Sequence, residues 1–240
     1  HRFPDAERRD HLAALELTPA APADTDGQLA APIARRRTDR RRFSTWPVPA
    51  SMLSALTERA AEQGALLRPV TGAAATTLAA ALRYAAAVQD RTPGYATETA
   101  LWTGGEPGDD GIPAANLLSA APDPTRGRRF PAGRIDEPET DEPDGALLVV
   151  IGTASDDPMS QLRAGEALSA VTLHATTFGL ASCPLSQVLE VGDTRRTLRD
   201  DALDGAMSPQ LVLRLGFAPP APLPATPRRP VDEVLFGEPG

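Results

Sequence analysis

The chain is organised around residues 35–43, Arg35-Arg36-Arg37-Thr38-Asp39-Arg40-Arg41-Arg42-Phe43. Six arginines fall within eight positions of a protein whose formal net charge is -8. Guanidinium groups bind phosphate oxygens with two hydrogen bonds at once, and a threonine hydroxyl adds a neutral donor. Two interpretations stay open at this point: a bound phosphate, or a solvated basic helix end where cations suit the helix dipole.

Composition indicates a globular protein with one core. The chain has 240 residues, of which 41% are hydrophobic and 23% charged, so it can bury one core plus appendages. All 24 basic residues are arginine and none is lysine. This bias weakens an argument from any single arginine, but it does not explain why six of them sit together.

Several function classes are excluded by charge and residue usage. A sequence pI of about 5.0 argues against general nucleic-acid binding, and no apolar run approaches membrane-spanning length. The single cysteine, Cys183, excludes an internal disulfide framework and fits a reducing cytoplasm. The chain begins at His1 without a signal-like segment, so we expect it to start inside a longer polypeptide.

Hydrophobic periodicity predicts an α+β domain over residues 25–240, preceded by a connector at 1–24 that is the tail of an earlier segment. The clearest strands are 146–152 and 210–216, and 65–70 is a shorter one. Between 180 and 187 the pattern indicates a short connection. Residues 104–144 are dense in Gly, Pro, Asp and Arg, which predicts a loop or lid. Helices are expected at 5–17, 25–37, 51–63, 76–89, 95–102, 159–178, 193–198 and 231–236.

Common catalytic signatures are absent from the sequence. There is no P-loop, nucleophile elbow or dinucleotide-binding glycine motif, and the histidines His1, His11 and His174 lie too far apart for a metal-site spacing. A packing or surface role is expected for His174 and a buried, unreactive one for Cys183. We therefore assign no catalytic residue. Such a profile is typical of an enzyme that leaves the chemistry to a cofactor.

Three features remain: the arginine run, residues 179–187, and the basic pair Arg228-Arg229. In this order they resemble the nitroreductase family of flavoproteins, and in more detail its actinobacterial Acg subfamily. The family's Arg-Arg-Ser-x-Arg-x-Phe opening is matched at 36–43 with one extra residue. Further likeness lies in Tyr95…Trp102-Thr103-Gly104, Asp110-Gly111-Ile112-Pro113, Cys183-Pro184-Leu185-Ser186-Gln187 and Pro227-Arg228-Arg229-Pro230.

The resemblance implies a central, mostly antiparallel sheet flanked by helices, with FMN as cofactor and NAD(P)H as possible reductant. Pro184, Leu185 and Ser186 would border the flavin ring. The phosphate contacts would come from Arg36, Arg37, Thr38 and either Arg40 or Arg41, aided by Arg228 or Arg229. By the same likeness the flavin site forms either between two subunits or within one chain built as a pseudo-dimer.

The chain also departs from the family. It lacks the acidic-glycine step after Pro184, which removes an expected hydrogen bond to flavin N5, and residues 104–144 are long enough to cover the pocket. Three functions follow: an NAD(P)H-dependent reductase of nitroaromatic or quinone-like acceptors, a protein that sequesters or stores FMN, and a scaffold without flavin. Asp39 has to turn away and pair with an arginine if the run is to bind a phosphate.

Overall fold

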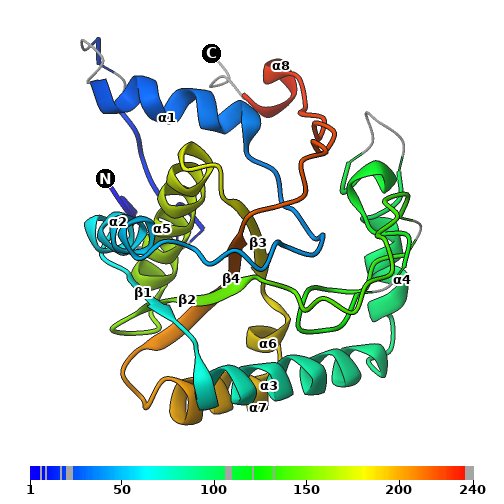
Figure 1. Ribbon diagram of the computed structural model, residues 1–240. Coiled ribbons are helices and arrows are strands. Elements are labelled where there is room, and N and C mark those ends of the chain that lie inside the picture. The colour runs from blue at the N-terminus through cyan, green and yellow to red at the C-terminus, as the bar shows by residue number, and fades with distance from the viewer. Residues whose placement is uncertain are drawn as a thin grey trace.

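A computed structural model gives the structure of the chain (Figure 1). It describes residues 1–5, 7–8, 10–16, 18–19, 24–105, 110–120, 122–131 and 133–235, with backbone alone for 24–28. Along the chain the elements are α1 (Asp24–Arg35), α2 (Ala50–Glu62), β1 (Leu66–Pro69), α3 (Gly72–Asp90), α4 (Tyr95–Leu101), the 3₁₀ turn η1 (Ala114–Asn116), β2 (Leu147–Thr153), α5 (Pro158–Thr177), β3 (Ala181–Leu185), α6 (Gln187–Glu190), α7 (Gly192–Thr197), the π-helical turn η2 (Leu198–Ala202), β4 (Ser208–Gly216) and α8 (Val231–Val234).

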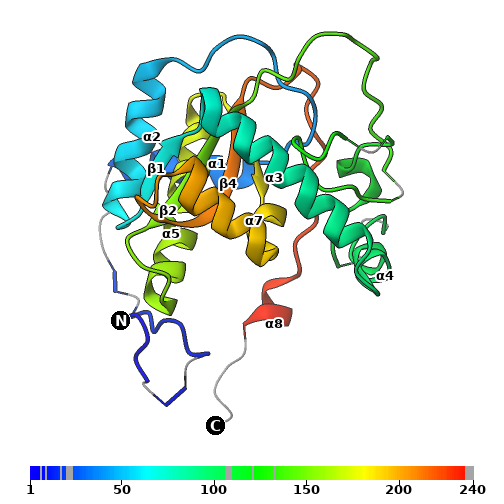
Figure 2. The ribbon, with the colours of Figure 1, turned by 90° about the horizontal axis from the view of Figure 1, so that it is seen from below.

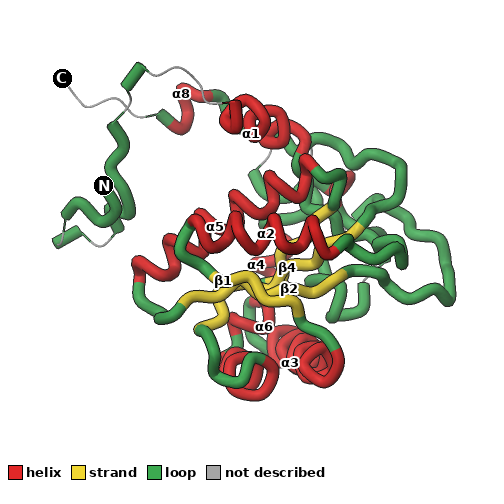
Figure 3. The backbone as a smooth tube through the Cα atoms, turned by 60° about the vertical axis from the view of Figure 1, so that its left-hand side comes forward, coloured by secondary structure: helices red, strands yellow, loops and turns green. Residues whose placement is uncertain are grey.

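The four strands form one antiparallel sheet in the order β1-β2-β4-β3. Helices cover both of its faces, α2 and α5 on one side and α3 and α6 on the other (Figure 3). The α+β prediction of an antiparallel sheet flanked by helices is therefore confirmed. No helix in the described part of the chain is long and apolar enough to cross a membrane.

Alternation along β2 builds two separate cores. Val149 and Ile151 face α2 and α5, whereas Val150 faces α3. Because successive strand residues point to opposite faces, a strand that is apolar throughout has to lie between two helical layers. The prediction that 146–152 is a central strand is confirmed.

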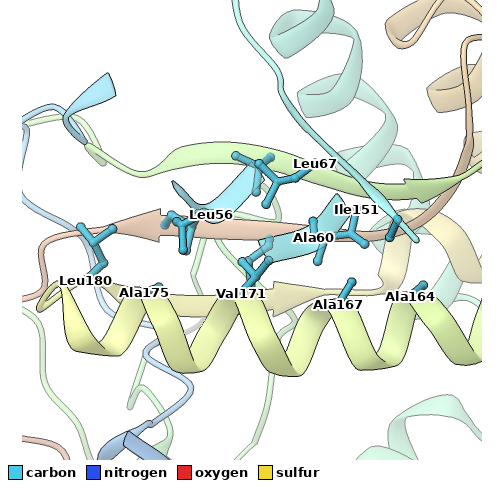
Figure 4. Packing of buried hydrophobic residues seen from close by; sticks show 13 residues of the cluster. Leu56, Ala60, Leu67, Ile151, Ala164, Ala167, Val171, Ala175 and Leu180 are labelled. Carbon is cyan, nitrogen blue, oxygen red and sulfur yellow. The ribbon is translucent and has the colours of Figure 1, made fainter. Parts of the chain in front are cut away.

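The long helix α5 approaches the first face of the sheet through small side chains. Ala164, Ala167, Val171 and Ala175 recur at helical spacing and point at the strands (Figure 4). The helix begins at Asp157, whose carboxylate accepts a hydrogen bond from the Ser160 N–H at 2.8 Å. It ends before Gly179, which takes the left-handed φ of +75° that a glycine adopts without strain.

On the second face α3 presents Leu78, Ala81, Leu82 and Ala85, with α7 alongside (Figure 2). The last buried residue of that stripe is polar: Gln89 is 5% exposed. A buried amide at the end of an apolar stripe requires hydrogen-bond partners, and these lie at the site.

Two expectations are wrong. Residues 181–185 are a strand, not a connection: β3 is an edge strand, where Pro184 is tolerated because its missing N–H can face away from the ladder. The expected helix at 5–17 is also absent: in the described part of that stretch the chain instead makes an isolated bridge between Arg2 and Ala13. Leu17 and Phe236, at the ends of two expected helices, lie outside the described residues.

Candidate functional site

The arginine run lies along the free edge of β3. Thr38 forms a parallel bridge with Ser182, and the Asp39 N–H donates to the Ser182 carbonyl at 3.0 Å. Side chains of an extended segment alternate between two faces, so residues 37, 39 and 41 share one face and 36, 38 and 40 the other. The two faces have different partners.

Protein groups occupy the face of Arg37, Asp39 and Arg41. Asp39 and Arg41 are buried and form a bidentate ion pair, with an Nη2–Oδ2 distance of 2.7 Å and an Nε–Oδ1 distance of 2.9 Å. Arg41 also donates to the Ala221 carbonyl, and Arg37 donates to the Pro224 carbonyl. The prediction that Asp39 pairs with an arginine is confirmed.

The face of Arg36, Thr38 and Arg40 is open. Among the residues that the structure describes, none of these three side chains has a hydrogen bond or an ion pair. Burial lowers the pKa of Arg36, and the neighbouring charges of Arg228 and Arg37 lower it further. Burial likewise lowers the pKa of Arg40. Buried or crowded cations without a counter-charge indicate that an anion or an acceptor-rich ligand belongs on this face.

A cavity of about 790 Å³ adjoins this face at Arg40. Its wall combines Arg40 with Cys183–Gln187 of β3 and α6, with α3 and α4, and with parts of 111–130. Four of the ten predicted site residues therefore line one cavity: Arg40, Pro184, Leu185 and Ser186. The volume lies within the range of small-molecule sites.

The remaining predicted residues, Thr38 among them, do not line this cavity. Arg36, Arg37 and Arg41 border a second depression of about 450 Å³, beside residues 218–223. Arg228 lies near Arg36, as its effect on the pKa of Arg36 shows, and donates to the carbonyls and hydroxyl of Thr226 and Pro227. Arg229 pairs with Asp110, next to the cavity wall at Gly111.

One end of the cavity holds a polar network that sequence reasoning missed. Glu190 accepts from Arg128 at 2.5 Å, from Ser186 at 2.7 Å and from the Gln89 amide at 2.5 Å. Gln89 Oε1 in turn accepts from the Gln187 amide at 2.9 Å and from the Tyr95 hydroxyl at 3.1 Å. The carboxylate can only accept, so it orients both amides. The one sequence signal was Gln89 at the end of an apolar helical stripe.

Comparison with known proteins decides the family. No protein-family model matches the chain. The Mycobacterium tuberculosis protein named "Putative NAD(P)H nitroreductase Rv3131" is 40% identical over 240 residues, covering 98% of this chain and 69% of that protein. A second protein of the same organism, "Putative NAD(P)H nitroreductase acg", is 36% identical over 242 residues, covering 98% and 72%. The chain belongs to the nitroreductase family.

Solved nitroreductases share the fold. The FMN-dependent nitroreductase NfnB of Mycobacterium smegmatis, solved with NADPH, aligns with a TM-score of 0.56 and 17% identity, over 90% of this chain and 100% of that one. A Bacteroides fragilis nitroreductase with bound FMN gives a TM-score of 0.55 at 14% identity, over 88% and 98%. These likenesses confirm the predicted nitroreductase fold.

The chain buries an arginine beside the site. Arg214 of β4 is fully buried and donates to Asp144 at 2.7 Å and to the carbonyls of Arg41 and Arg126 at 3.1 Å. Its guanidinium carbon lies 4.5 Å from the centroid of the Phe43 ring. Arg214 thus joins β4, the arginine run and the segment that walls the cavity.

Burial, not an activating partner, has the largest influence on the pKa of the cysteine and on that of the histidine of α5. Cys183 is buried, and burial raises the pKa of its thiol, so it stays protonated at neutral pH. His174 packs edge-on against Phe178 on α5, and burial lowers its pKa. Within the described residues, no group of three or more His, Cys, Asp or Glu side chains could hold a metal ion.

Proposed function

We propose that this chain binds FMN in the 790 Å³ cavity and reduces nitroaromatic or quinone-like acceptors with NAD(P)H. The observation that carries the proposal is the open face of Arg36, Thr38 and Arg40. In the described structure none of these three side chains has a hydrogen bond or an ion pair. Arg40 lines the cavity, and Arg228 is near Arg36. The names of the relatives, and the FMN and NADPH of the solved neighbours, support it.

The residues fit a ligand that is anionic at one end and planar at the other. Four residues of extended chain separate Arg36 from Arg40, roughly 13 Å. Arg36, Thr38 and Arg228 would hold the phosphate at the outer end. Arg40, which lies in the cavity with Pro184, Leu185 and Ser186, would face the ring. Arg37, Arg41 and Arg229 already have protein partners, so we place them outside the ligand set.

Bound FMN would supply the redox chemistry, taking a hydride equivalent from NAD(P)H and passing electrons to the acceptor. The chain's own residues bind and orient. Pro184 and Leu185 offer an apolar floor, and Arg40 is a fixed positive charge at one edge of the cavity. Gly111, Ile112, Gly127, Arg128 and Phe130 also line the cavity and would help to exclude water from a bound ligand.

A second function, FMN storage without turnover, is favoured by one observation. Gly111, Ile112, Gly127, Arg128 and Phe130 of segment 104–144 form one wall of the cavity. Arg40 stacks on Phe130, with its guanidinium carbon 5.0 Å from the ring centroid. A wall held in this way covers a ligand and would hinder the approach of a second substrate.

Two titrations test the proposal. Purified protein should bind FMN much more tightly than riboflavin, which lacks the phosphate, and NADPH should bleach the bound flavin under anaerobic conditions. Arg36→Ala should weaken FMN binding by about 1.5–3 kcal/mol, or roughly 10- to 150-fold, and leave riboflavin binding unchanged. Arg59→Ala, on α2 away from the cavity, is the control. Equal affinity for FMN and riboflavin would contradict the assignment of a phosphate site. If FMN binds but NADPH does not bleach it, the protein stores FMN and does not turn it over.

We also propose that the protein works in the cytoplasm, either as a homodimer or as one chain that provides both halves of the flavin site. Its composition, with one buried cysteine, supports the first point. Light scattering of purified protein, with and without FMN, distinguishes the two assemblies.

A further inference from the structure

The C-terminal crossover, residues 217–230, has to be held by side chains. Six of its fourteen residues are prolines, at 219, 220, 222, 224, 227 and 230. In the described structure no backbone N–H of residues 218–230 donates to a backbone carbonyl. A proline-rich segment lacks the donors for a strand ladder, so its own backbone does not fix its path.

Three side chains hold the crossover by its carbonyl groups. Arg37 Nε donates to the Pro224 carbonyl at 3.2 Å, and Asn116 Nδ2 donates to the same oxygen at 2.9 Å. Arg41 Nη1 donates to the Ala221 carbonyl at 2.8 Å. Figure 1 shows the crossover rising from β4 past the chain that leaves α1.

These donors are themselves well fixed. Asp39 binds Arg41 through two side-chain hydrogen bonds, at 2.7 and 2.9 Å. Arg37 Nη1 also donates to the Ala34 and Arg36 carbonyls at the end of α1, at 2.7 and 2.8 Å. Asn116 is 4% exposed and sits in η1, within the segment that walls the cavity.

Because the crossover is held in place, the guanidinium of Arg228 lies near that of Arg36. Arg228 follows Pro224 by four residues and lies close enough to Arg36 to lower its pKa. Two like charges repel, and a free tail would swing Arg228 away from Arg36 into solvent. Holding the pair together without an anion costs free energy, which the three donors offset together with the neighbouring ion pair between Arg229 and Asp110.

We propose that Arg37, Arg41 and Asn116 are positioning residues that hold residues 218–224 so that Arg228 faces Arg36 across the phosphate. The proposal rests on the proposed function, because it assigns these residues to the same FMN phosphate site. It separates two roles within one arginine run: Arg36 and Arg40 contact the ligand, and Arg37 and Arg41 contact the tail.

A double-mutant cycle tests the coupling. The measured quantity is the ratio of the riboflavin Kd to the FMN Kd, which isolates the contribution of the phosphate. Asn116→Leu, which removes a neutral donor away from the charges, should lower this ratio about threefold or more. Arg228→Ala should lower it further. In the Arg228→Ala background Asn116→Leu should have no additional effect, because the residue it positions is gone.

Two further variants make the test specific. Arg37→Gln keeps an N–H donor for the Pro224 carbonyl but removes the charge, so it should retain more of the ratio than Arg37→Ala. Gln210→Leu is the matched control, since the Gln210 amide donates at 2.9 Å to Thr153, at the opposite end of β4 from the crossover. It should leave the ratio unchanged. Circular dichroism melts confirm that each variant is folded.

The outcomes are separable. If the wild-type protein binds riboflavin as tightly as FMN, there is no phosphate site, and both the proposed function and the positioning role are wrong. If the wild type discriminates but Asn116→Leu and Arg228→Ala have additive effects, the FMN site stands and the positioning role is overturned. The positioning role is likewise overturned if Arg37→Gln behaves as Arg37→Ala.

Discussion

Arg214 shows how one residue links parts of the chain that are distant in sequence. It is a charged residue in an otherwise apolar stretch of β4, and its side chain is 0% exposed. Its donors reach residues 41, 126 and 144, and its flat face covers Phe43. A charge buried this deeply is stable only while its partners are present.

Arg214→Met is therefore expected to lower the free energy of unfolding by about 3–5 kcal/mol, because it leaves Asp144 and two carbonyls without their donor. Urea denaturation followed by circular dichroism measures the loss. Arg195→Met is the control: it breaks the ion pair with Asp156, in which the Arg195 side chain is 33% exposed and the Asp156 side chain 45%. It should lower the free energy of unfolding by no more than about 1 kcal/mol. Equal losses in the two variants would contradict the role of Arg214.

The arginine run illustrates the limit of residue-type reasoning. All of its arginines suit phosphate equally well by chemistry. Alternation along an extended segment then places Arg36 and Arg40 on the face without ion pairs, where we propose the ligand binds, and Arg41 on the face that contacts the tail. This division depends on the run pairing with β3, which the sequence pattern had predicted as a connection.

At the scale of the element, α5 is defined by its ends. Its pattern, acidic residues before Pro158 and a glycine after Phe178, predicted both boundaries to within a residue. The Asp157 carboxylate accepts hydrogen bonds from Ser155 Oγ at 2.6 Å and from the Ser160 N–H at 2.8 Å. These bonds, the Ser155 bond first, lower the pKa of Asp157 below its usual value.

The lowered pKa of Asp157 makes the stability of the protein depend on pH in a direction that can be measured. A carboxylate with a lowered folded-state pKa contributes stability above its unfolded pKa, about 3.9, and loses it as the pH falls through the folded value. Asp157→Ala should therefore lower the melting temperature at pH 6, and its deficit should shrink below about pH 4. Thermal melts from pH 6 to pH 2.5 test this, with the exposed Glu58→Gln on α2 as control. A deficit that stays constant with pH would contradict the assignment.

At the scale of the whole molecule, segment 104–144 is attached where it returns to the sheet. A Cβ on Gly145 would lie 2.0 Å from the Ser44 carbonyl oxygen and 2.5 Å from the Thr45 Cα, both in the backbone. The carbonyl of Phe43, the residue before Ser44, accepts from the Gly145 N–H at 3.1 Å. Two parts of the chain about a hundred residues apart in sequence thus cross at a point where only glycine fits.

Gly145→Ala should push these two segments apart and lower the free energy of unfolding by about 1–3 kcal/mol. It should also weaken FMN binding, because Phe43 and Ser44 follow directly on the arginine run and Gly145 follows the segment that walls the cavity. Gly165→Ala is the matched control: it lies at an exposed position of α5 with nothing within 4 Å of its Cβ, and it should be neutral or stabilise by about 0.5–1 kcal/mol. If Gly145→Ala proves as harmless as Gly165→Ala, the crossing tolerates a side chain and the interpretation is wrong.

Local pattern alone was enough for most elements and for the family. Helix periodicity, the apolar strands and the order of the three motifs depend on residues close in sequence, where spacing and residue chemistry act directly. Thus α2, α3, α5, β2 and β4 were predicted, and so was the pairing of Asp39 with an arginine. Pro184 made β3 resemble a connection, because an edge strand accepts a proline that a central strand would reject.

Only tertiary structure decided which polar groups are free. The tail carbonyls that Arg37 and Arg41 bind lie 187 and 180 residues away, and Gln187 donates to Gln89 across 98 residues. No local spacing encodes such pairs, since they depend on how helices and tail pack around the sheet. The order of the three motifs indicated the family from sequence, but the fold decided which arginines of the run have protein partners, because a buried donor is free only when no carbonyl or carboxylate is within reach.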